Sequence, residues 1–149
     1  MEQAPSGTPT LAPWARRLAA IVVDDLIVVA PAAIGVILIY AGVEGAGFAV
    51  GLVFLLFGLT IGQALYFTIL NGNERGQTYG KRALAIRVID AQEGGPIGYG
   101  RSLARWGVPF VVNLIFGFFS LIDNLWPLWD ARNQALHDKF ANSIVVREH

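Results

Sequence analysis

The sequence contains no cysteine, and this absence excludes disulfide bonds, thiolate metal sites and thiol nucleophiles. Charged side chains are also scarce: they make up 15% of the 149 residues, whereas soluble domains are usually about one quarter charged. The formal net charge is zero, so no excess of positive charge indicates a nucleic-acid partner. A chain of this length has room for one domain. The shortage of charge therefore predicts a membrane protein rather than a soluble enzyme.

Two long apolar runs occupy the first half of the chain. Residues 18–40 are apolar except for Asp24 and Asp25, and residues 47–70 carry no charge. Each run exceeds the roughly 20 residues that cross a hydrocarbon core as an α-helix. We therefore predict transmembrane helices over about 16–41 and 47–70, joined by a short loop into an antiparallel hairpin.

A third apolar region, residues 108–129, is interrupted by Pro109, Asn113, Gly117 and further polar residues. Its uninterrupted core is shorter than the roughly 20 residues that a span prefers. We expect helix over about 101–129, either as one tilted span or as a re-entrant helical hairpin that turns near Gly117. Both alternatives stay open at this point.

Short strands are predicted on either side of the third region. Residues 84–90 and 143–147 alternate and are rich in β-branched side chains, which favours a small paired ribbon. The basic residues before the first run and in the loop 71–100 place the N-terminus, this loop and the ribbon in the cytoplasm. The Pro-, Ser- and Gly-rich residues 1–13 are predicted to be a disordered cytoplasmic tail. The predicted fold class is an all-α membrane protein with two transmembrane helices, a third spanning or re-entrant segment and this ribbon.

Asp24 lies within the first apolar run, where an unpaired carboxylate costs about 2.5–3.5 kcal/mol on insertion scales. Arg17 precedes it by two helical turns and projects from nearly the same face. Asp24 is either a contact for a proton, cation or substrate, or a buried polar group that fixes the helix register. We expect a basic partner for it, Arg17 or Arg132. Asp25 either shares this site or faces the headgroups.

Four glycines form a stripe on the second run. They fall within about 60° of arc at 100° per residue, so another helix can approach closely. That helix is either the first run of the same chain or a second copy. The stripe consists of Gly47, Gly51, Gly58 and Gly62.

Other motifs in the sequence predict no cofactor. Residues 76–82 resemble a phosphate-binding loop but have three residues between the glycines, and Arg82 instead of Ser or Thr follows Lys81. His137 and Asp138 are adjacent, so on a helix they point about 100° apart and should not form a dyad. Two histidines without a cluster of acidic residues do not predict a metal site. We expect no metal, no cofactor and no enzymatic activity.

In combination, these segments resemble the RDD family of bacterial membrane proteins, which is named for one arginine and two aspartates. Arg17 and Asp24, within residues 14–24, are similar to the arginine and the first aspartate. Residues 77–90 resemble the family's T-x-G-K-R…V-x-D segment, and residues 129–138 resemble its closing D-x-R…L-H-D segment. The second aspartate is either Asp130 or Asp138. The resemblance runs over most of the predicted membrane domain, residues 14–147.

The resemblance implies a multi-pass protein of the bacterial inner membrane, with transport of an unidentified ligand as the suggested role. We expect a transport or ion-exchange component that uses Asp24. Its partners would come from Asp25, Lys81, Arg82, Arg132 and His137. The alternative is a non-catalytic accessory or assembly subunit of a larger membrane complex. The expected partners are the lipid bilayer and further copies or other subunits, not nucleic acid.

Overall fold

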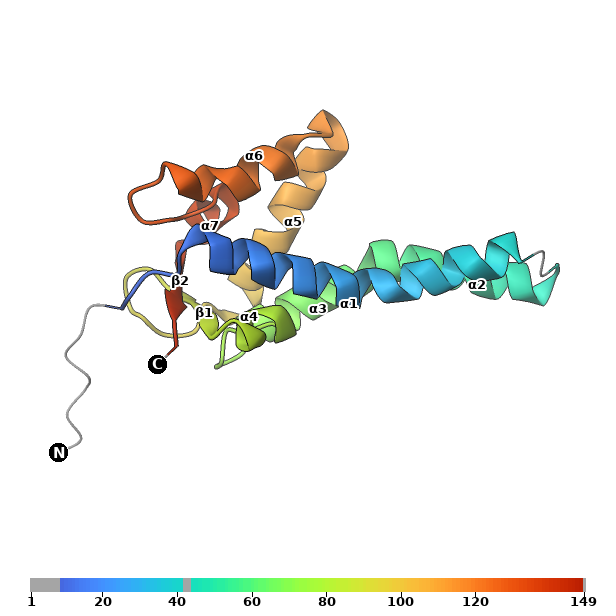
Figure 1. Ribbon diagram of the computed structural model, residues 1–149, viewed down its shortest axis with the longest axis horizontal. Coiled ribbons are helices and arrows are strands. Elements are labelled where there is room, and N and C mark those ends of the chain that lie inside the picture. The colour runs from blue at the N-terminus through green and yellow to red at the C-terminus, as the bar shows by residue number, and fades with distance from the viewer. Residues whose placement is uncertain (1–8, 42–43, 149) are drawn as a thin grey trace.

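A computed structural model describes residues 9–41 and 44–148 (Figure 1). The predicted disorder of residues 1–8 and the middle of the loop after the first helix lie outside the described residues. The helices and strands are, in chain order, α1 (Trp14–Tyr40), α2 (Ala46–Leu59), α3 (Ile61–Gly72), α4 (Tyr79–Ala83), β1 (Ile86–Asp90), α5 (Gly98–Phe116), α6 (Phe119–Leu125), the 3₁₀ helix η1 (Trp126–Leu128), α7 (Leu136–Phe140) and β2 (Ser143–Arg147).

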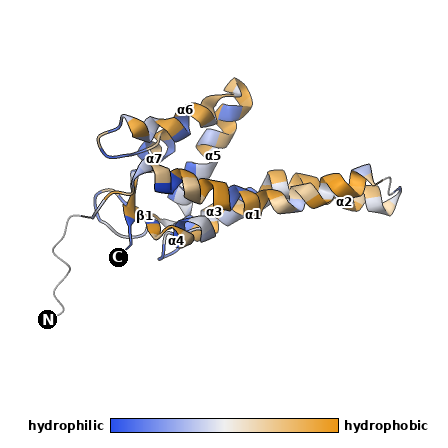
Figure 2. Cartoon of the chain, in the orientation of Figure 1, coloured by the Kyte–Doolittle hydropathy of each residue, from blue (hydrophilic) through white to orange (hydrophobic). Residues whose placement is uncertain are grey.

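A long helical hairpin dominates the shape of the molecule. Its two arms, Trp14–Tyr40 and Ala46–Gly72, are each 27 residues long and apolar enough to cross a membrane. Only 22% and 11% of their most apolar windows are buried, unlike the core helix of a soluble protein. Figure 2 shows that the half of this hairpin next to the α1–α2 loop is largely hydrophobic. The hairpin matches the two predicted helices, although the second arm is interrupted at Thr60, which the sequence analysis did not predict.

Glycines allow α1 and α2 to pack at very short distance. A Cβ atom added at Gly58 would lie 2.6 Å from the backbone nitrogen of Ala32, and one at Gly51 would lie 3.0 Å from the carbonyl oxygen of Gly35. The two helices could not approach this closely with side chains at these positions. Gly51 and Gly58 thus face the first helix of the same chain, whereas an added Cβ at Gly62 would meet Phe57.

The third apolar region folds as a helical hairpin. α5 ends at Gly117, whose φ of 65° lies in the left-handed region that glycine adopts readily. Asn113 closes the turn, because its carbonyl oxygen accepts from Gly117 N at 2.8 Å and its side chain accepts from Ser120 N at 3.3 Å. Of the two alternatives left open for residues 101–129, the chain adopts the helical hairpin that turns at Gly117 and not one continuous helix.

The two predicted strands pair, which confirms the β-ribbon. β1 and β2 are antiparallel, with Ile86 opposite Arg147 and Asp90 opposite Ser143. The ribbon forms the centre of the apolar core, because Ile86, Val88 and Val145 pack against Ala20 of α1. Both described ends of the chain lie beside this sheet, at the end of the molecule opposite the α1–α2 loop (Figure 1).

The predicted disordered tail is too long. Leu11 forms a bridge to Val146, Ala12 N donates to the carbonyl oxygen of Val145 at 2.9 Å, and Arg147 N donates to Thr10 at 2.8 Å. Ala12 is fully buried in the core beside the ribbon. The composition of this segment predicted disorder. Composition does not reveal that β2 has a free edge with which the segment can pair.

Candidate functional site

Asp24 lies at a junction of three helices and is 1% exposed. Its Oδ1 accepts from the hydroxyl of Tyr66 on α3 at 2.7 Å and from Gly80 N on α4 at 2.8 Å. Its Oδ2 accepts from the hydroxyl of Thr78 at 2.5 Å. Three neutral donors therefore hold the carboxyl group and fasten α4 to α1.

The short helix α4 fits against α1 because of its own sequence. The side chain of Thr78 caps the helix by accepting from Lys81 N at 3.3 Å. A Cβ atom at Gly80 would lie 2.2 Å from the carbonyl oxygen of Ala20, so only glycine permits this approach. The segment from Thr78 to Lys81 thus packs against α1 by binding Asp24, and it is not a phosphate-binding loop.

The prediction that Asp24 pairs with Arg17 or Arg132 is wrong. Within the described residues, Asp24 forms no ion pair. Arg17 bonds Asp138 instead, and Arg132 is exposed and donates to the carbonyl oxygen of Ala91 at 3.1 Å. Asp25 is exposed on the outer face of α1 and does not join the Asp24 site. Hydroxyl and amide donors arrive on α3 and α4, and this satisfies the carboxyl group without an arginine.

A second buried carboxyl group, Asp138 on α7, collects the basic residues. Its Oδ2 accepts from Arg17 Nη2 and from Ala135 N at 3.0 Å, and its Oδ1 accepts from Arg105 Nη2. Its side chain is fully buried. Burial alone would raise the pKa of Asp138, but the charges of Arg105 and Arg17 hold it well below its usual value.

His137 lies between two carboxylates. Its Nδ1 is 2.5 Å from Asp123 Oδ2, and its Nε2 is 3.3 Å from Asp138 Oδ1. The prediction that His137 and its neighbour do not pair is wrong, because the far nitrogen of the ring reaches around to the adjacent carboxylate. Burial alone would lower the pKa of His137, but the charges of Asp138 and Asp123 raise it above its usual value.

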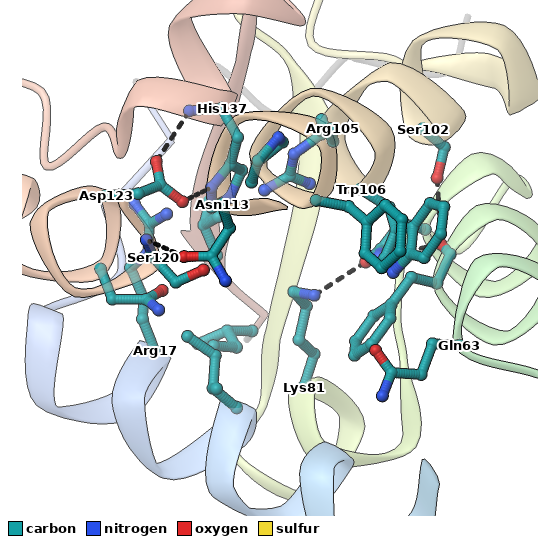
Figure 3. A pocket seen from close by; sticks show the side chains of 18 residues that line it. Arg17, Gln63, Lys81, Ser102, Arg105, Trp106, Asn113, Ser120, Asp123 and His137 are labelled. Carbon is teal, nitrogen blue, oxygen red and sulfur yellow. Dashed lines mark hydrogen bonds and ion pairs between the residues drawn. The ribbon is translucent and has the colours of Figure 1, made fainter. Parts of the chain in front are cut away.

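Next to these groups is a cavity of about 320 Å³ (Figure 3). Lys81 reaches it from α4 and donates from Nζ to Asn71 Oδ1 at 2.8 Å. Burial, followed by repulsion from Arg105, lowers the pKa of Lys81 to about 7. The stacked rings of Trp106 and Phe110, with centroids 4.7 Å apart, line another part of the cavity. The polar and charged side chains in the lining are Arg17, Gln63, Asn71, Lys81, Ser102, Arg105, Asn113, Ser120, Asp123, Asn124 and His137.

The remaining predicted residues lie outside this cavity. Asp130 pairs with the exposed Lys139 and accepts from Arg132 N and Gln134 N at 3.1 and 3.0 Å. Arg82 is exposed on the outer side of α4. Of the two candidates for the second family aspartate, only Asp138 contacts Arg17. In residues 9–41 and 44–148, no group of three or more His, Asp or Glu side chains is arranged to hold a metal ion.

Two residues of the site, Arg105 and Asp123, were not predicted from the sequence. A signal was available for Arg105: Ser102, Arg105, Pro109 and Asn113 follow each other at helical spacing and all line the cavity. Asp123 offered no such signal, because it follows the turn at Gly117.

Comparison with known proteins gives one family and a small number of relatives. The model of the RDD family matches residues 11–142. The chain is 35% identical over 71 residues to the proline-rich antigen homolog of Mycobacterium tuberculosis and to the proline-rich antigen of Mycobacterium leprae. These alignments cover 48% of this chain and only 28% and 27% of the relatives, so the chain spans about a quarter of their length. No solved structure matches.

Proposed function

The chain belongs to the RDD family of bacterial membrane proteins, and on this premise we propose that it is a multi-pass transport or ion-exchange component of the inner membrane. In this proposal the N-terminus, the ribbon and the tail lie in the cytoplasm. The α1–α3 hairpin spans the bilayer, and the α5–α6 hairpin enters it from the cytoplasmic side without crossing. The solute or ion binds in the cavity beside Lys81 and Arg105.

One observation carries this proposal: a cavity lined by charged side chains lies among helices whose outer faces are apolar. Leu26 of α1 and Leu114 of α5, for example, are 72% and 73% exposed, as expected for side chains that face lipid. Ionisable groups inside such a bundle are expensive and are commonly functional. The cavity is also at the lower end of the roughly 300–1,000 Å³ that ligand pockets occupy. Its size suits a small solute.

The role of Asp24 in this proposal is to position other residues. Two of its three hydrogen bonds hold the segment from Thr78 to Gly80 against α1. Lys81 follows directly, so the placement of its amino group in the cavity depends on this contact. We assign no catalytic step, because both ring nitrogens of His137 are already close to carboxylates.

A second candidate is a non-catalytic accessory subunit, and the surface of the hairpin favours it. The far part of α1 and α2 packs only within the hairpin and exposes apolar side chains on its outer faces. A single hairpin surrounds no pathway, so transport requires further copies or other subunits. An accessory protein would use the same surface to bind a larger membrane complex.

Flux measurements in proteoliposomes separate the two candidates. A pH-sensitive dye in the lumen reports proton movement when a gradient of pH, or of a sodium, potassium or phosphate salt, is imposed. We expect flux above that of protein-free liposomes, a large loss in Lys81→Gln and no change in the matched control Arg82→Gln, which removes the same charge outside the cavity. Wild-type flux equal to that of protein-free liposomes under every gradient would contradict transport and leave the accessory function.

A further inference from the structure

The carboxylate groups at the cavity are already occupied. Both oxygens of Asp123 are bound by His137, through its backbone N at 2.9 Å and its Nδ1 at 2.5 Å. Both oxygens of Asp138 are occupied by Arg17, Arg105 and Ala135 N. Asn71 Oδ1 accepts from Lys81. A cation entering this cavity would therefore have to displace existing ion pairs to gain a carboxylate ligand.

Donor groups, in contrast, remain available. The side chain of Arg105 is 6% exposed, and only its Nη2 is bound; Nε and Nη1 are buried and have no hydrogen-bond partner among the described residues. The amino group of Lys81 has three N–H bonds and donates one to Asn71. A buried donor without a partner costs about 1–3 kcal/mol, and more when it is charged. The cavity therefore favours a ligand that brings acceptors.

We propose that this cavity binds an oxyanion, a phosphate group, between Arg105 and Lys81. The proposal rests on the cavity of the proposed function and names the chemistry of its ligand. Figure 3 shows the two side chains reaching the same space from different helices, α5 and α4. The guanidinium fork of Arg105 retains two N–H donors, Nε and Nη1, from which an oxyanion can accept charge-assisted hydrogen bonds, and the ammonium group of Lys81 adds a point charge. Because Nε and Nη1 lie within the cavity wall, binding requires the guanidinium to turn toward the ligand while Nη2 stays on Asp138.

The electrostatics of the cavity agree with this assignment. Arg17, Lys81 and Arg105 are cationic residues in the lining, whereas Asp123 is the acidic residue there and is bound by His137. Arg105 disfavours the charged form of Lys81, and an anion between the two would relieve this repulsion. The stacked Trp106 and Phe110 give the ligand an apolar wall, which suits an anionic group on a small organic body or on a lipid.

A binding experiment in the uncharged detergent dodecylmaltoside tests the proposal and separates two sources of the anion. Calorimetric titration with inorganic phosphate, against chloride at matched ionic strength, tests a soluble anion. Titration with phosphatidylglycerol, against uncharged diacylglycerol, tests a lipid headgroup. We expect at least one of the two anions to bind. Lys81→Gln should weaken this binding roughly tenfold or more, since a charge-assisted hydrogen bond contributes about 1.5–3 kcal/mol. Arg82→Gln should bind like the wild type.

Each outcome decides the proposal. Binding of phosphate alone identifies a soluble anion, and binding of phosphatidylglycerol alone identifies a lipid headgroup; both support the site. Failure of both anions to bind, or equal binding by Lys81→Gln and the wild type, would overturn it. Arg105→Lys keeps a charge beside Asp138 but removes the fork, and its loss of affinity, with unchanged thermal stability, would support the site independently. Binding without flux in proteoliposomes would contradict the transport function and support the anion site. Flux without binding would contradict the anion site and support transport.

Discussion

Two buried aspartates with similar burial are stabilised in different ways. Asp24 accepts from two hydroxyl groups and one backbone N–H, whereas Asp138 faces two guanidinium groups and an imidazole. Neutral donors stabilise either a carboxylate or an amide at Asp24. At Asp138 the negative charge itself is required, because removing it leaves Arg17 and Arg105 buried with no counter-charge.

Replacing the two closing-segment aspartates by asparagine should therefore have very different effects. Asp138→Asn should lower the free energy of unfolding by about 3–5 kcal/mol, because buried charges lose their partner. Asp130→Asn removes a pair with Lys139, whose side chain is 44% exposed, and should lower it by roughly 1 kcal/mol or less. Denaturant titration of the purified protein in detergent measures both. Similar losses in the two variants would show that Asp138 is not the centre of the ion-pair cluster.

At the scale of helices and strands, the elements that could be predicted are those that hydropathy or alternation determines locally. Hydropathy located α1 and the α2–α3 arm, and alternation located β1 and β2. α4 and α7 were not predicted, because five-residue helices are unstable alone and depend on contacts with distant groups such as Asp24. The turn at Gly117 was one of two alternatives that composition alone did not separate.

The seam between α1 and α2 should be intolerant of a single methyl group. A Cβ at Gly58 meets the backbone of Ala32 at 2.6 Å, so Gly58→Ala should destabilise the protein by about 1–3 kcal/mol through overpacking. Gly107 lies inside α5 with nothing within 4 Å of an added Cβ. Gly107→Ala should therefore be stabilising by about 0.5–1 kcal/mol. Thermal unfolding in detergent compares the two, and a neutral or stabilising Gly58→Ala would mean that α1 and α2 are not this close.

At the scale of the whole molecule, contacts between residues far apart in the chain could not be predicted from the sequence. Arg17 and Asp138 are 121 residues apart, and periodicity says nothing about contacts over such a separation. The family resemblance pointed to Arg17, Asp24 and two candidates for the second aspartate. It did not show that Arg17 pairs with Asp138 while Asp24 binds Tyr66 and Thr78. The Arg17–Asp138 contact requires the end of the chain to return beside its beginning, as the pairing of β1 with β2 allows.

This return of the chain leads to a prediction about membrane topology. Glu148 N donates to the carbonyl oxygen of Ala85 at 2.8 Å, next to the paired strands, so positions 85 and 148 must lie on the same side of any membrane. In the proposed orientation, which the basic residues before α1 and in the loop after α3 favour, that side is the cytoplasm. Because the chain has no cysteine, single cysteines can be introduced at Glu44, Arg75 and Glu148 without background.

A membrane-impermeant maleimide applied to intact spheroplasts should label Glu44→Cys and spare Arg75→Cys and Glu148→Cys. All three positions are exposed, so permeabilised cells should label each of them and provide the control. The reverse pattern would invert the orientation and retain the fold. Labelling at 44 and 148 but not at 75 would place the tail outside. The third apolar region would then have to cross the bilayer, which the pairing of β1 with β2 does not allow.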